Sequence, residues 1–163
     1  MKKKIALFFV IVLSLSLITA CGKEDPVKKS DFENQMNNFT RKLNDMDLYI
    51  NSIDTDVEGY EQNLLDYLDE LLITFKNLKS YEEPVEYIYY DDLVNAACFF
   101  MEKSNSYFHK ALEETYNANF YEAAIRFYDE AFENVHYIGY MLNGYDVSEV
   151  VHTLDELEKQ YND

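Results

Sequence analysis

Apolar residues occur in two different patterns along the chain. A nearly continuous apolar stretch runs from Ile5 to Ala20 and is interrupted only by two serines and a threonine. Beyond residue 30, apolar residues instead recur every three or four positions, which is the spacing of amphipathic helices. Stripes of this kind are buried most simply when several helices pack side by side, so the pattern predicts an all-α fold, an antiparallel bundle of about four to five helices over residues 31–163.

The first two stripes are regular. One consists of Phe32, Met36, Phe39, Leu43, Met46, Ile50, Ile53 and Val57, and the next of Leu64, Leu68, Leu71, Phe75 and Leu78. Between them, Thr55 and Glu58 fit a capping box that would start a new helix. The first stripe also continues through Tyr60 into Leu64, so the pattern leaves open whether residues 31–80 form two helices or one.

A break at 80–84 separates these stripes from the rest, because the residue before Pro84 avoids the helical region. The third stripe consists of Leu93, Ala97, Phe100, Ser104, Phe108, Ala111 and Thr115, with small residues where another helix could approach closely. Asn119 and Glu122 predict the cap of a fourth helix, whose stripe is Phe120, Ala124, Phe127, Ala131, Val135, Ile138 and Leu142. After a turn at 143–146, a short last helix is predicted from Val147, Val150, Val151, Leu154 and Leu157.

The N-terminal stretch has the form of a secretory signal peptide, because three lysines precede the apolar residues. Its 16 residues fall short of the roughly 20 that span a bilayer. The segment Ile18-Thr19-Ala20-Cys21 resembles the lipobox of bacterial lipoproteins. The resemblance implies cleavage before Cys21, whose sulfur carries a diacylglyceryl group. It divides the chain into a signal peptide (1–20), a lipidated tether (21–30) and the bundle (31–163).

An uncleaved membrane anchor is the alternative interpretation of this stretch. In both cases the N-terminal lysines stay in the cytoplasm. The expected location is therefore the extracytoplasmic face of the cell membrane, where two acyl chains suffice for stable anchoring.

The charge of the chain narrows the choice of partners. It has 14 Lys and Arg against 31 Asp and Glu, a net charge of −17. Removal of residues 1–20 leaves 11 against 31, or −20. Such an anion repels nucleic acid and anionic lipid surfaces. Basic proteins, basic peptides or metal ions are the expected partners, and an acidic surface that only keeps the protein soluble is the alternative.

Residues 119–131 resemble the second helix of a tetratricopeptide repeat. Tyr121, Ala124, Tyr128 and Ala131 stand at the spacing of that family. The resemblance covers a single unit and implies a helical hairpin of the kind that binds peptides in a groove. The same alternation of alanine and aromatic residues also fits ordinary helix packing.

Three further patterns bear on metals and thiols. Asp54 to Gly59 resembles the start of an EF-hand calcium loop, but Leu65 stands where a bidentate glutamate is needed. Glu133 and His136 form one Glu-x-x-His pair, whereas di-iron bundles use two pairs and two more glutamates. Cys98 lies among small and aromatic residues and is expected to be a buried free thiol. Neither a metal site nor a cofactor is predicted.

Tyrosine is unusually frequent, with 15 Tyr and no Trp. One group stands beside carboxylates and forms the candidate interaction surface, made of Tyr81, Tyr87, Tyr89, Tyr90, Asp91 and Asp92. Residues 87–90 cannot all face one core if they are helical, so some rings would be exposed. Tyrosine and carboxylate together suit a basic or peptidic ligand. The alternative is a set of amphipathic residues at the margin of the bundle.

Catalytic patterns are missing from the sequence. It has no nucleophile beside a base and no glycine-rich phosphate loop. The predicted function is therefore that of a non-enzymatic, membrane-anchored module for protein or peptide contacts. A cation-binding surface lipoprotein and a structural spacer of the cell envelope are the two alternatives.

Overall fold

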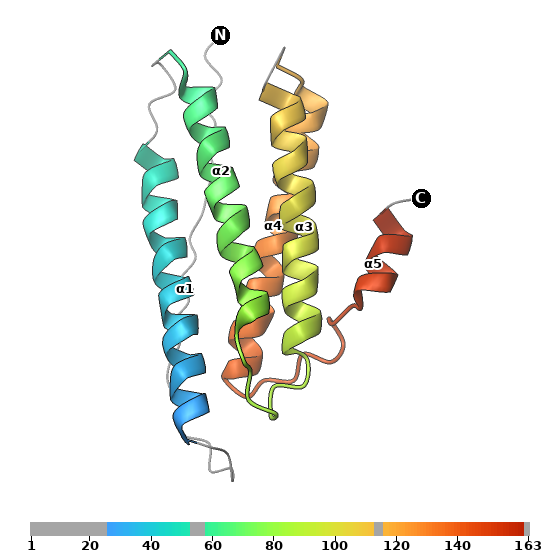
Figure 1. Ribbon diagram of the computed structural model, residues 1–163. Coiled ribbons are helices and arrows are strands. Elements are labelled where there is room, and N and C mark those ends of the chain that lie inside the picture. The colour runs from blue at the N-terminus through green and yellow to red at the C-terminus, as the bar shows by residue number, and fades with distance from the viewer. Residues whose placement is uncertain (1–25, 53–57, 113–115, 162–163) are drawn as a thin grey trace.

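The computed structural model describes residues 26–52, 58–112 and 116–161. Four long helices pack side by side and a short fifth helix lies against them (Figure 1). They are α1 (Pro26–Ser52), α2 (Tyr60–Asn77), α3 (Tyr90–Leu112), α4 (Ala118–Leu142) and α5 (Leu154–Tyr161), with a 3₁₀ turn, η1 (Leu78–Ser80), after α2. The predicted all-α bundle is confirmed. None of the helices in the described ranges is long and apolar enough to cross a membrane.

The first two stripes belong to separate helices. Gly59 precedes α2 with φ of +84°, a left-handed conformation that a helix cannot continue through. The two helices run side by side in opposite directions (Figure 1). Thr55 and most of the calcium-loop-like segment lie outside the described residues. At its other end α1 begins at Pro26, so residues 26–30 of the predicted tether are helical instead.

The core contains most residues of the predicted stripes, but Phe120 of the fourth stripe is exposed. In α1, Phe32, Met36, Phe39 and Leu43 are buried, and Met46 is half-buried. The later members of that stripe lie outside the described residues or side chains. Phe75 of α2 meets Phe39 of α1 and Phe132 of α4 edge to face, with ring centroids 5.8 and 5.4 Å apart. Three helices therefore share one aromatic cluster.

Small residues line the contact between α3 and α4. Ala97, Ser104 and Ala111 recur every seven residues on α3 and are fully buried, as are Ala124 and Ala131 on α4. The Ser104 hydroxyl donates a 2.9 Å hydrogen bond to the Ala124 carbonyl, so the two backbones approach closely there. The predicted close approach at these positions is confirmed. Ala124, Tyr128 and Ala131 of the repeat-like segment are all buried.

Two predicted boundaries are wrong. Asn117, not Asn119, caps α4, because its side chain accepts hydrogen bonds from the backbone N–H groups of Asn119 and Phe120 at 3.1 and 3.3 Å. The last helix begins at Leu154, and Val147 to Val151 precede it in turns and irregular chain. Thr153 and Glu156 form a reciprocal capping box that starts α5 there.

We expect Ser104→Leu to destabilise the bundle by about 2–4 kcal/mol, because it overpacks the seam and removes a buried hydrogen bond. Ser106 is exposed two residues further along α3. Ser106→Leu should therefore change stability by less than about 0.5 kcal/mol. Urea unfolding of the two variants measures the difference, and equal losses would contradict a close approach at Ser104.

Candidate functional site

A cleft lies between the second half of α1 and the first half of α2. It has a volume of about 460 Å³ and is open to solvent. Its lining residues are Asp45, Met46 and Tyr49 from α1 and Asn63, Asp66, Tyr67 and Glu70 from α2. Spacings of three and four place each set on one helical face, so the two helices form the two walls. We call this the α1–α2 cleft.

A stacked pair of tyrosines joins the two walls. The rings of Tyr49 and Tyr67 are 4.6 Å apart between centroids and 24° from parallel. Tyr67 is buried and Tyr49 is partly exposed, so the pair presents aromatic surface to the solvent side. Aromatic faces attract cations and pack well against the methylene groups of long basic side chains.

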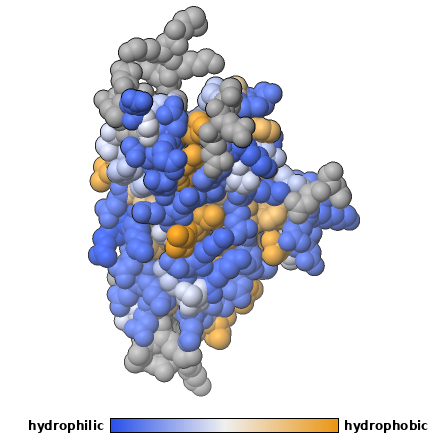
Figure 2. Space-filling view, turned by 45° about the horizontal axis from the view of Figure 1, so that its top comes forward, coloured by the Kyte–Doolittle hydropathy of each residue, from blue (hydrophilic) through white to orange (hydrophobic). Residues whose placement is uncertain are grey.

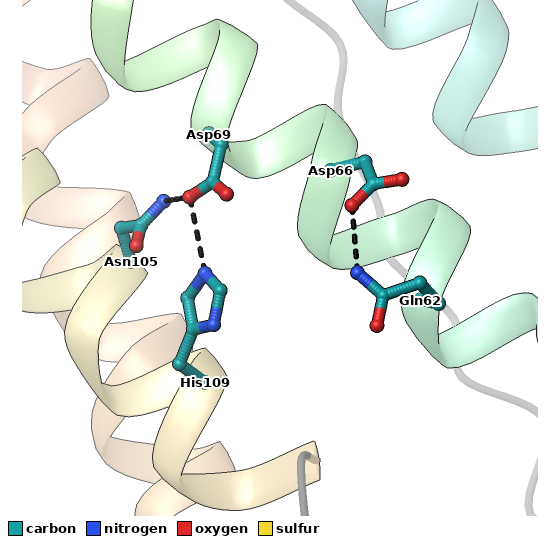
Figure 3. A network of polar contacts seen from close by, with 5 residues as sticks. All are labelled: Gln62, Asp66, Asp69, Asn105 and His109. Carbon is teal, nitrogen blue, oxygen red and sulfur yellow. Dashed lines mark hydrogen bonds and ion pairs between the residues drawn. The ribbon is translucent and has the colours of Figure 1, made fainter.

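Three carboxylates line the same cleft as this aromatic pair. Asp45, Asp66 and Glu70 are all exposed, and no Lys or Arg is among the residues that line the cleft. Asp66 accepts a 2.7 Å hydrogen bond from the amide of Gln62, one turn earlier on α2 (Figure 3). The cleft therefore has a negative potential, and its chemistry suits a cationic group.

A polar contact joins α2, which forms one wall of the cleft, to α3. The Asp69 carboxylate accepts hydrogen bonds from the Asn105 amide at 2.7 Å and from Nε2 of His109 at 3.0 Å (Figure 3). Partial burial tends to raise the pKa of Asp69, but the hydrogen bonds from Asn105 and His109 outweigh it and lower that pKa below its ordinary value. Asp69 therefore helps to hold α2 against α3. It is not among the residues that line the cleft.

The predicted tyrosine surface is wrong at Tyr90. This residue is 1% exposed, and its hydroxyl donates a 3.1 Å hydrogen bond to the Leu78 carbonyl. Burial raises its pKa strongly. Tyr81, Tyr87 and Tyr89 are half-buried against the core, which fits the alternative of residues at the bundle margin, while Asp91 is exposed and Asp92 half-buried at the start of α3. The prediction failed at Tyr90 because this first residue of α3 points into the core, where its ring packs edge to face on Phe32 at 5.2 Å.

The other candidates from the sequence are Cys21, Cys98 and the pair of Glu133 and His136. Cys21 lies outside the described residues. Cys98 is buried as expected, with Sγ 3.3 Å from the Phe75 carbonyl, and burial raises its pKa to about 11. Glu133 accepts a hydrogen bond from the Tyr137 hydroxyl, which raises the pKa of Tyr137 to about 12. Within the described ranges, no group of three or more His, Cys, Asp or Glu side chains is placed to hold a metal ion.

The sequence did not single out the α1–α2 cleft. Its acidic residues are spread over 26 positions, and nothing in the sequence says which polar faces of two helices lie opposite each other. One feature of the sequence could have pointed to the cleft. Each of the two helices carries a tyrosine beside acidic residues, Tyr49 on α1 and Tyr67 on α2. No protein-family model, curated protein or solved structure matches this chain.

We expect Asp69→Asn to reduce stability at neutral pH by less than about 1 kcal/mol, because the Asp69 side chain is 51% exposed and solvent screens the contact. A carboxylate with a lowered pKa stabilises the fold above its unfolded pKa, and that contribution disappears as the pH falls through the folded pKa. The difference between wild type and variant should therefore vanish in acid, where Asp69 is protonated.

Thermal unfolding of both proteins across this pH range is the measurement. The matched substitution Asp66→Asn on the same helix is the control, since it removes the same charge from an exposed side chain that is bonded within α2. A difference between Asp69→Asn and wild type that persists unchanged in acid would contradict the proposed contact.

Proposed function

We propose that this protein is an extracytoplasmic lipoprotein, anchored through Cys21, and that its bundle binds basic segments of a protein or peptide without catalysing a reaction. The α1–α2 cleft is the proposed binding site. The observation that carries this proposal is the placement of three carboxylates around a stacked tyrosine pair. The net charge of −17 adds a long-range attraction for basic partners.

The position of the cleft suits a partner that approaches from outside. Asp45 follows Pro26 by 19 residues of continuous α1, which corresponds to about 28 Å at 1.5 Å per residue. The cleft therefore lies toward the end of the bundle opposite the anchor. Figure 2, which turns this end toward the viewer, shows a largely hydrophilic surface with separate hydrophobic patches.

Arginine or lysine side chains fit this site best. Their methylene groups can lie on the tyrosine rings while the charged end meets Asp66 or Glu70. Exposed ion pairs contribute only about 0.2–1 kcal/mol each. We therefore expect one basic side chain to bind weakly and several together to give useful affinity.

We expect tetra-arginine amide to bind the mature protein in detergent with a dissociation constant of about 1 mM or below at low salt, and tetra-glutamate not to bind. Neutralising the cleft by Asp45→Asn, Asp66→Asn and Glu70→Gln together should weaken tetra-arginine binding by about tenfold. Isothermal titration calorimetry measures both effects.

The control removes the same number of charges elsewhere, by Glu122→Gln, Asp155→Asn and Glu158→Gln, all at exposed positions. Equal weakening by the control would show that only overall charge matters. A rise in melting temperature with calcium or iron that the cleft variant abolishes would favour the cation-binding alternative instead.

Anchoring has its own test. We expect membrane-bound protein to have the mass of residues 21–163 plus a diacylglyceryl group, and Cys21→Ala to remain a full-length precursor. Because Cys98 is buried with a raised pKa, the native mature protein should not react with a water-soluble thiol reagent. After denaturation it should react with one equivalent. A full-length product with an unmodified Cys21 thiol would contradict anchoring.

A further inference from the structure

The start of α1 limits how far the bundle can stand from the membrane. This step rests on the proposed lipidation of Cys21. Only five residue steps separate Cys21 from Pro26, the first residue of α1, and they span at most about 18 Å even when fully extended. Whatever the conformation of this short segment, the end of the bundle at Pro26 stays close to the bilayer surface.

The connection between α2 and α3 lies at this same end (Figure 1). The ring of Phe32, in the second turn of α1, is 5.7 Å from the ring of Tyr87 and 5.2 Å from that of Tyr90. Pro26 precedes Phe32 by six residues, or about 9 Å along the helix axis. The residues around Tyr87 are therefore close to the membrane in the anchored protein.

Two consecutive turns shape this connection. The N–H of Tyr87 donates to the carbonyl of Pro84 at 3.0 Å, and the N–H of Tyr90 donates to the carbonyl of Tyr87 at 2.9 Å. We call residues 84–90 the double turn. Buried Pro84 and Tyr90 fix its two ends to the core, so the double turn has a defined shape before it meets any partner.

The double turn displays two aliphatic side chains. Val85 and Ile88 are 85% and 73% exposed, and each occupies the second position of one of the turns. They project where the backbone bends outward. Together they give this end of the bundle exposed apolar surface that a partner can cover.

The charge around the double turn distinguishes between possible occupants. Residues 30–33 and 79–92 together contain seven Asp and Glu against one Lys. A net negative surface is repelled by anionic headgroups and by a second copy of itself. It is complementary to lysine and arginine. A lipid surface therefore fits the aliphatic side chains but not the charge, whereas a basic protein surface fits both.

We propose that the double turn docks on an extracytoplasmic segment of an integral membrane protein that lies close to the bilayer and presents Lys or Arg beside an apolar depression. Val85 and Ile88 fill the depression, and Asp91 and Asp92 at the start of α3 face the basic residues. The short tether keeps the double turn in the layer where such a segment is found.

Photocrosslinking in intact cells tests the proposal. A benzophenone side chain is placed at Ile88 in the full-length protein and, as control, at Tyr116, which is 56% exposed between α3 and α4, at the end of the bundle away from the tether. We expect a discrete product with an integral membrane protein from Ile88 and none from Tyr116. Asp91→Asn with Asp92→Asn should reduce that product by about three- to tenfold, whereas Asp155→Asn with Glu158→Gln should leave it unchanged.

The tether is tested in the same assay. Inserting 20 Gly and Ser residues before Pro26 adds a flexible reach of about 25 Å and should reduce the product severalfold by lowering the effective concentration. Unchanged crosslinking after the insertion, crosslinking to lipid, crosslinking only between copies of this chain, or equal products from Ile88 and Tyr116 would each overturn the proposal.

Failure of the anchor is recognised separately. The mass of the crosslinking protein shows whether Cys21 is acylated. An acylated protein that gives no product from Ile88 overturns the docking proposal alone, while an unacylated protein overturns both. Melting temperatures of the Asp91 and Asp92 variants confirm that a lost product does not reflect unfolding.

Discussion

The close contact of α3 with α4 is the interaction on which the rest of the bundle depends. Buried alanines and Ser104 let the two backbones approach, and the resulting hairpin supports the other helices. On one side, α2 packs against α3 through Cys98 at the Phe75 carbonyl and through Asn105 at Asp69. On another, Tyr161 of α5 meets Phe100 and Phe127 at ring distances of 5.3 and 5.8 Å.

The cleft lies where α1 packs against α2. The buried side chains of α1 run from Phe32 to Leu43, and Met46 is only half-buried. Leu48 is already 70% exposed. Met46 and Tyr49 line the cleft from α1 at this level. The stacked tyrosine pair joins the two walls without filling the space between them.

The sequence predicted the core well because burial has a period. Residues such as Phe39, Leu71 and Ala131 recur at helical spacing, and the hydrophobic effect places them in the core. Their burial does not depend on the residue at which each helix begins or ends. Boundaries were less predictable, since Asn117 and Thr153 compete with neighbours of similar capping strength. The separation of α1 from α2 was left open because an apolar stripe can continue past a glycine.

The binding surfaces were harder to predict because they depend on tertiary contacts. Tyr90 looks like its neighbours in the sequence, and only its hydrogen bond to the Leu78 carbonyl distinguishes it as a core residue. The cleft has no local signature for a related reason. Asp45 and Asp66 belong to different helices, and their proximity follows from the helix packing that also exposes Val85 and Ile88 elsewhere.

The acidic cleft also has an energetic implication for function. The walls of the cleft bring Asp45, Asp66 and Glu70 to one open surface without a lining cation. A cationic ligand that contacts several of these carboxylates at once is attracted to the folded protein more strongly than to the unfolded chain, where the same groups are far apart. Binding of this kind stabilises the folded protein. In the function that we propose, this is the reason that the cleft, and not any single carboxylate, is the binding site.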